Sequence, residues 1–352
     1  MNKIHSSQLF AILMLSAAWQ VLCIPQMQGG AQLIGIAAAL AVQLFLTIPM
    51  LLLARGGFSF WQTITVHKML GFVYVLFFLL WGAVGFSRFW EVSAEISLPL
   101  SGSTAAVLMV ITCLYTCSLG LKAMARCAPL MLGVLALSVL VLCIGAYSRV
   151  DITRLAPESE GFLQSGISYF CLCGELTAAF VLLDRAKGGR QRAVWGFLAG
   201  KAAFACLVIF LCICAAGRLA GLSGYPFFTL TALSQPLQSQ RADALYILVF
   251  VMLFVMHITL QTGVISHLLH AMFPKLRAAA PVSLAVMLLF SYSLPLTRQP
   301  AELICGILTV LTAFAIPLLF YLNRRFSHEK TPPASAGSAS PASDGLRNGA
   351  HQ

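Results

Sequence analysis

Ten apolar stretches divide the chain, and they constrain its fold more than any other feature. A helix needs about 20 mostly apolar residues to cross the hydrocarbon core of a bilayer. Most of these stretches have about that length. Spanning segments of this kind are helical because an unpaired backbone N–H or C=O is costly in lipid. The sequence therefore predicts an all-α polytopic membrane protein with ten transmembrane helices, at about 9–24, 31–54, 69–89, 103–121, 129–148, 164–184, 193–216, 242–269, 281–297 and 302–322.

The composition excludes a soluble enzyme. Hydrophobic residues make up 59% of the chain and charged residues only 9%, and the mean hydropathy is +0.89. No Walker A loop, nucleophile elbow or His-Glu-x-x-His motif is present in the sequence. The eleven cysteines lie mostly inside apolar runs, where they behave as small buried hydrophobes. We therefore expect no enzymatic activity, no cofactor and no metal site.

The basic residues predict the orientation of the chain. Lys and Arg collect in cytoplasmic loops, so the net charge of +11 does not indicate a nucleic-acid partner. With the N-terminus inside and the loops alternating, fifteen Lys and Arg lie inside and six outside, while Lys201 falls within a span. This bias predicts a multi-pass protein of the cell membrane with both termini in the cytoplasm.

Two regions outside the spans have distinct compositions. Residues 327–352 are rich in Ser, Ala, Pro and Gly and are expected to form a disordered cytoplasmic tail, which leaves 1–326 as the membrane domain. The outer segment at about 217–241 contains Gly224, Tyr225 and Pro226, and its alternatives are a short helix or a cap over the outer mouth.

Glu175 and Lys201 are the ionisable residues expected near the membrane midplane. Burying such a group costs about 2.5–3.5 kcal/mol by insertion scales, so each is a candidate for function. Gly174 precedes Glu175 and weakens the helix, and transporters expose backbone groups to a substrate at breaks of this kind. Glu175 then contacts a ligand or carries a proton, or it only holds helices together. Lys201 either pairs with Glu175 and couples to it, or snorkels toward the cytoplasm.

Other polar side chains within spans have two interpretations. Ser16, Trp19 and Gln20 in the first span either face the segment around Glu175 or make ordinary interhelical hydrogen bonds. His257, His267 and His270 lie in the eighth span, where local hydrogen bonding is favoured over metal binding because further ligands are not evident.

Five short phrases stand in a characteristic order along the chain: Ile4-His5-Ser6-Ser7-Gln8-Leu9-Phe10, Gly120-Leu121-Lys122-Ala123-Met124-Ala125-Arg126, Gly174-Glu175, Tyr225-Pro226 and Arg241-Ala242-Asp243-Ala244-Leu245. Together they resemble the spore-germination receptor B-subunit family (GerAB type) of the amino acid/polyamine/organocation transporter superfamily, over about residues 4–323. The chain departs from the family at Ala18 and Gln20, where glycines are frequent, at Leu172, where a Pro is common, and at Lys122, where Glu is usual. The resemblance adds the inner spore membrane as an alternative location to the cell membrane.

The resemblance implies a LeuT-like fold of five plus five helices in inverted repeat, here about 7–148 and 164–323. It also implies an amino-acid site between a broken first and a broken sixth helix. Expected partners are a small nutrient, a germination receptor A-type subunit, a lipoprotein C-type subunit and the lipid bilayer. Glu175 and Lys201 are expected to couple ligand binding to conformational change or proton movement. The residues expected to bind the ligand are Ser16, Trp19, Gln20, Tyr169, Phe170, Cys173, Gly174 and Glu175.

Three functions remain open from the sequence. The first is a subunit of a spore germination receptor that senses a nutrient, an amino acid in the leading hypothesis, and signals by conformational change. The second is a proton-coupled secondary amino-acid transporter, which would use the same fold and site. The third is a membrane scaffold with no ligand of its own.

Overall fold

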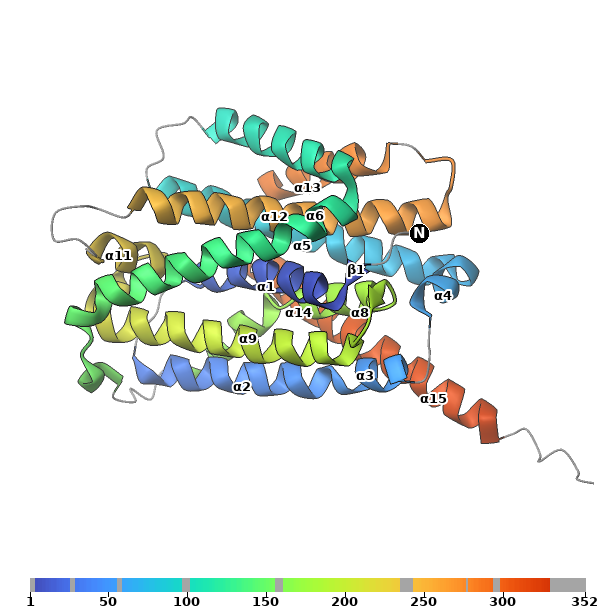
Figure 1. Ribbon diagram of the computed structural model, residues 1–352, viewed down its shortest axis with the longest axis horizontal. Helices are drawn as coiled ribbons and strands as arrows, with labels where there is room; N and C mark the ends of the chain where they lie inside the picture. The colour runs from blue at the N-terminus through green and yellow to red at the C-terminus, as the bar shows by residue number, and fades with distance from the viewer. Residues whose placement is uncertain are drawn as a thin grey trace, which may run out of the picture.

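The computed structural model is helical nearly throughout, and most helices lie along its long axis (Figure 1). It describes residues 4–25, 29–55, 59–96, 102–155, 161–234, 243–276, 278–293 and 298–329. Seven helical segments in these ranges are long and apolar enough to cross a membrane, and two shorter apolar helices accompany them. The chain is therefore an all-α, multi-pass integral membrane protein.

The first half of the chain begins with a two-residue strand and a short apolar helix. A turn at Thr47 separates α2 from α3, and together these two helices form one apolar segment long enough to span a membrane. The elements are β1 (Ile4–His5), α1 (Ser6–Leu22), α2 (Gly30–Leu46), α3 (Ile48–Arg55), α4 (Phe60–Val66), α5 (Lys68–Glu95) and α6 (Gly102–Ala146), followed by short 3-10 turns η1 (Tyr147–Arg149) and η2 (Ile152–Leu155).

Helix α6 is broken at Gly120, where the sequence predicts the end of one span. Gly120 has φ 81° and ψ 163°, a conformation that is essentially restricted to glycine. Figure 1 shows the two arms of α6 running in different directions from this point. The backbone of one glycine thus separates the predicted spans at 103–121 and 129–148.

The second half contains an interrupted helix followed by longer ones. Helix α9 is extended by a π-helical turn, η3, and short helices α10 and α11 occupy the segment where a short helix was one of the two expectations. The elements are α7 (Phe162–Cys171), α8 (Glu175–Leu183), β2 (Ala186–Lys187), α9 (Arg190–Leu211), η3 (Cys212–Ala216), α10 (Arg218–Leu222), α11 (Pro226–Leu233), α12 (Asp243–Met272), α13 (Ala279–Ser293), α14 (Arg298–Val310), η5 (Leu311–Ala315) and α15 (Ile316–Glu329).

Helix α1 lies in the centre of the bundle. Every residue from Ala11 to Leu22 is buried, and the helix packs against α6, α8, α9 and α12. In contrast, the long α6 exposes large apolar side chains such as Leu130 and Leu137. Exposed apolar residues on a spanning helix are suited to contact with lipid, so α6 lies at the periphery (Figure 1).

The beginning and end of the described chain lie at the same end of the bundle (Figure 1). There β1 pairs in parallel with β2, Ile4 beside Ala186 and His5 beside Lys187. The disordered tail was predicted to begin at residue 327, but α15 continues to Glu329, so the first three residues of that range are helical. The rest of that prediction lies outside the described residues.

Candidate functional site

The helix predicted at 164–184 is interrupted at the expected place. Helix α7 ends at Cys171, α8 begins at Glu175, and Leu172 to Gly174 connect them. The N–H groups of Leu172 and Cys173 donate to the carbonyls of Tyr169 and Phe170. Each acceptor is three residues earlier, instead of four as in a regular α-helix. A Cβ on Gly174 would collide with the indole of Trp81, so glycine permits the connection to pack closely against α5.

Glu175 and Lys201 form a buried ion pair at this break. Lys201 Nζ, in α9, donates to Glu175 Oε1, and the two side chains are 1% and 0% exposed. Glu175 is the first residue of α8, where the helix dipole stabilises a carboxylate. Its second oxygen, Oε2, has no hydrogen-bond partner among the described residues. One carboxylate oxygen therefore stays available inside the bundle.

Gln43 and Cys173 complete the surroundings of Lys201. The ammonium group donates to Gln43 Oε1 at 2.6 Å and lies 3.1 Å from Cys173 Sγ. Gln43 Nε2 donates to the same sulfur at 2.8 Å. Helices α2, α8 and α9 and the α7–α8 connection thus meet at one polar cluster in an apolar interior.

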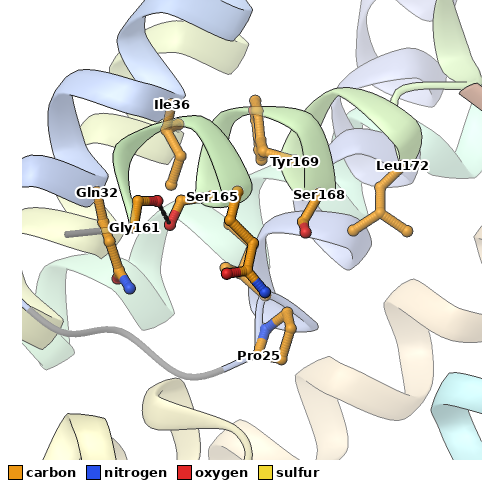
Figure 2. Close-up of a pocket in the computed structure, with 10 residues that line it drawn as sticks. Pro25, Gln32, Ile36, Gly161, Ser165, Ser168, Tyr169 and Leu172 are labelled. Carbon is orange, nitrogen blue, oxygen red and sulfur yellow. Dashed lines mark hydrogen bonds between the residues drawn. The ribbon is translucent and has the colours of Figure 1, made fainter. Parts of the chain in front are cut away.

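A cavity of about 310 Å³ lies beside α7, between it, α2 and the end of α1. Figure 2 shows Pro25, Gln32 and Ser168 around a common space along α7. Ser165 lines it too, with its hydroxyl donating to the carbonyl of Gly161 at 2.8 Å. The full lining is Ile24, Pro25, Gln32, Ile36, Gly161, Gln164, Ser165, Ser168, Tyr169 and Leu172.

Tyr169 connects this cavity to the ion pair. It lines the cavity, and Lys201 Nζ lies 5.4 Å from the centroid of its ring. Its hydroxyl is buried and has no hydrogen-bond partner among the described residues. A buried donor without a partner is costly, so a polar ligand atom that reached this hydroxyl would be stabilised by it.

The residues predicted in the first span take part in a second cluster. Ser16 Oγ lies 2.9 Å from His257 Nδ1, and His257 Nε2 lies 2.6 Å from Gln261 Nε2. Trp19 packs on Phe250 and Phe254. The amide of Gln20 is buried with no partner among the described atoms. Hydrogen bonding was the favoured interpretation of His257, and its ring has one partner in the same helix, Gln261, and one in α1, Ser16.

The other predicted site residues are found near the interruption, with one correction. Phe170, Cys173, Gly174 and Glu175 all lie in or beside the α7–α8 connection, and Phe170 is half-buried. The break in the first helix that the family resemblance implies is not found at Ser16 to Gln20, where α1 is continuous from Ser6 to Leu22, in line with the departures from the family at Ala18 and Gln20. Ala18 and Gln20 stand where flexible glycines would favour unwinding.

Gln43 is the member of the cluster that the sequence reasoning missed. It is a polar side chain inside the apolar run at 31–54, and it is fully buried. Polar residues within spans are commonly partners of other buried polar groups. The same test that selected Glu175 and Lys201, applied to uncharged side chains, would have found it.

The site combines an interrupted helix, a buried pair of opposite charges and a cavity of ligand size. Such an arrangement can bind a small polar molecule and hold or release a proton. No family model and no curated protein matches the chain.

Proposed function

We propose that the chain is the nutrient-sensing, permease-like subunit of a spore germination receptor, and that it binds an amino acid beside the α7–α8 break. The observation that carries the proposal is the buried Glu175–Lys201 pair, whose Lys201 lies against the ring of Tyr169, a residue that also lines the cavity. The volume of about 310 Å³ lies at the small end of the range of ligand pockets.

The polarity of the cavity suits a zwitterion. The carbonyl end of α7 carries partial negative charge and attracts an ammonium group. The hydroxyls of Ser168 and Tyr169 can donate to a carboxylate, and Ile36 and Leu172 offer apolar contact to a side chain. A ligand bound in the cavity contacts Tyr169, and a movement of the Tyr169 ring changes the surroundings of Lys201. The ligand signals only through its different affinities for the two conformations.

The finer features of the fold belong to the same proposal. They are ten spanning helices, a LeuT-like five-plus-five repeat, and both termini in the cytoplasm of a cell or inner spore membrane. Support comes from the break of α6 at Gly120 and from the end shared by the N-terminus and α15 (Figure 1). The A-type and lipoprotein C-type subunits are proposed as partners from the family resemblance, with no enzymatic activity in this subunit.

The first test is dipicolinate release from spores of the source organism. Wild-type spores and spores lacking this gene are challenged with a panel of single amino acids and sugars. Loss of the response to a few nutrients, restored by the wild-type gene but not by Glu175→Gln, is expected. An unchanged germination profile in the deletion, or a wild-type dose-response from Glu175→Gln, would contradict the proposal.

A second candidate is a proton-coupled amino-acid transporter, which one observation favours. Glu175 Oε2 has no partner among the described residues, so the carboxylate can accept a proton while Lys201 keeps its hydrogen bonds to Gln43 and Cys173. Concentrative uptake in proteoliposomes that collapses with the pH gradient would identify this function. Binding of an amino acid without uptake favours sensing instead.

A further inference from the structure

A second cavity, of about 400 Å³, lies beside β1. This strand is at the end of the bundle where the described chain begins (Figure 1). The walls of the cavity come from β1, from α6 around Gly120, from the α8–α9 connection and from the end of α12. Four of its lining residues are basic side chains, and the lining contains no carboxylate. The lining residues are Ile4, Leu119, Gly120, Leu121, Lys122, Arg185, His267, His270 and Ala271.

Arg185 gives this cavity a buried positive charge. Its side chain stacks on Trp61, with Cζ 4.1 Å from the ring centroid, and the residue is only 8% exposed. Nε is buried and has no hydrogen-bond partner among the described residues. Burial lowers the pKa of Arg185 to about 10, which leaves the guanidinium charged at neutral pH.

No described carboxylate forms an ion pair with Arg185. The neighbouring Asp184 directs Oδ2 to the backbone N–H groups of Phe60 and Trp61, at the start of α4. The ion pairs within the described ranges involve Arg88, Arg154 and Lys201 instead. Asp184 acts on Arg185 only through a longer-range electrostatic interaction. An anion from outside the chain that pairs directly with the buried guanidinium would therefore stabilise this end of the bundle.

The other basic residues supply donors around the same space. Lys122 is exposed at the rim and offers an amino group. His267 and His270 lie three residues apart on one face of α12, and an imidazole offers at least one N–H. Several donors converging from different helices suit the oxygens of a phosphate group, which form strong charge-assisted hydrogen bonds.

The surroundings of the cavity favour a lipid as the source of the phosphate. Leu119 lines the cavity and is itself 54% exposed, and Tyr115, one turn earlier on the same face of α6, is 65% exposed. This apolar face is suited to an acyl chain. Basic pockets between helices at a membrane surface bind the headgroups of anionic lipids. We propose that this cavity binds the phosphate group of an anionic phospholipid.

The test compares two substituted proteins in detergent and in lipid. The full chain is purified as wild type, as Lys122→Gln/His270→Gln and as the matched control Lys275→Gln. Lys275 is an exposed cation just beyond α12 that does not line the cavity. Native mass spectrometry measures retained phosphatidylglycerol against phosphatidylcholine, and inorganic phosphate is titrated separately against thermal stability.

Wild type and Lys275→Gln are expected to retain phosphatidylglycerol at least tenfold better than phosphatidylcholine. The double variant should lose about tenfold in that retention while keeping its thermal stability in lipid-free detergent. Stabilisation by inorganic phosphate alone, lost in the double variant, would support the phosphate site and assign it a soluble source. Equal retention of the two lipids with no effect of phosphate, or equal effects of the cavity and control substitutions, would overturn the proposal.

Discussion

Lys201 donates to Glu175 across the break between α7 and α8, and neither side chain reaches the protein surface. The two charges neutralise each other inside an apolar bundle. Removing one partner of such a pair leaves an uncompensated charge, which typically costs about 3–5 kcal/mol, whereas replacing both by apolar groups is often neutral. The pair is therefore best tested by comparing single and double substitutions.

We predict that Lys201→Met lowers the free energy of unfolding by about 3–5 kcal/mol. Adding Glu175→Leu to that variant should recover most of the loss, because no charge is then left buried. Thermal unfolding of the purified protein in detergent measures both. Losses that simply add in the double variant would show that the two side chains do not interact.

Tyr169→Phe should weaken ligand binding without weakening the fold. The hydroxyl that it removes has no partner among the described residues, so the variant should melt at or slightly above the wild-type temperature. If the hydroxyl binds the nutrient, affinity should fall about tenfold, which corresponds to 1.4 kcal/mol. Calorimetric titration with the nutrient identified by the spore assay measures the change. Unchanged affinity would place the ligand elsewhere.

Gly174→Ala should destabilise the protein through a steric clash. The backbone of Gly174 has φ −68°, which any residue adopts, but its Cβ would overlap the indole of Trp81. Overpacking of this kind costs about 1–3 kcal/mol. The smaller ring in Trp81→Phe should relieve part of the clash, so the double variant is expected to be more stable than Gly174→Ala. No such recovery would mean that the cost arises in the backbone.

Gly120→Ala should destabilise the protein through its backbone alone. A Cβ there meets nothing within 4 Å, but φ 81° with ψ 163° costs a non-glycine residue about 1–3 kcal/mol. Gly133, in the second arm of α6, also has open space and carries no positive φ. Gly133→Ala should therefore be neutral or stabilise by up to about 1 kcal/mol. Equal melting temperatures for the two variants would contradict this account.

Because of Asp184, the free energy of unfolding should fall as the pH rises through the acidic range. Burial raises the pKa of its carboxyl above the ordinary value, despite hydrogen bonds from Phe60 and Trp61. The folded chain then keeps this proton to a higher pH than the unfolded chain. Stability is therefore lost between about pH 4, the ordinary pKa of Asp, and the raised pKa.

Asp184→Asn should remove that loss when melting temperature is followed against pH. Asp151 provides a contrast of opposite sign, since hydrogen bonds from Thr153 lower the pKa of its carboxyl. The contribution of Asp151 to the free energy of unfolding is present above the ordinary pKa of Asp. It is lost as the pH falls through the lowered pKa of the folded state. Asp151→Asn should therefore flatten the curve at the acid end only. A wild-type profile in both variants would refute these assignments.

The sequence predicted the parts of this structure that depend on local chemistry. Apolar runs identify spans because lipid forces each backbone group to be paired within its own helix. Gly174 next to a charged residue indicated the break between α7 and α8. Pairing with Glu175 was one of two alternatives for Lys201, and the structure has the pair instead of a side chain that snorkels toward the cytoplasm. The role of the two residues in coupling stays a prediction.

The features that were not predicted depend on which helices become neighbours. Gln43 lies in the same cluster as Lys201 only because α2 packs against α9 and α7. His257 reaches Ser16 because α12 packs against α1. The cationic cavity joins four segments that are distant in the sequence. Helix periodicity carries little information here, since most of these helices are apolar on every side.

The central position of α1 has a consequence for biosynthesis. This helix leaves the ribosome well before α6, α8, α9 and α12, the helices that bury it. The pairing of β1 with β2, Ile4 beside Ala186, likewise forms only after residue 186 has been synthesised. Until α12 arrives, Ser16 lacks His257, and Gln20 faces lipid or the insertion machinery. Nascent chains stalled before α12 should therefore be held at the translocon and be cleared by quality-control proteases.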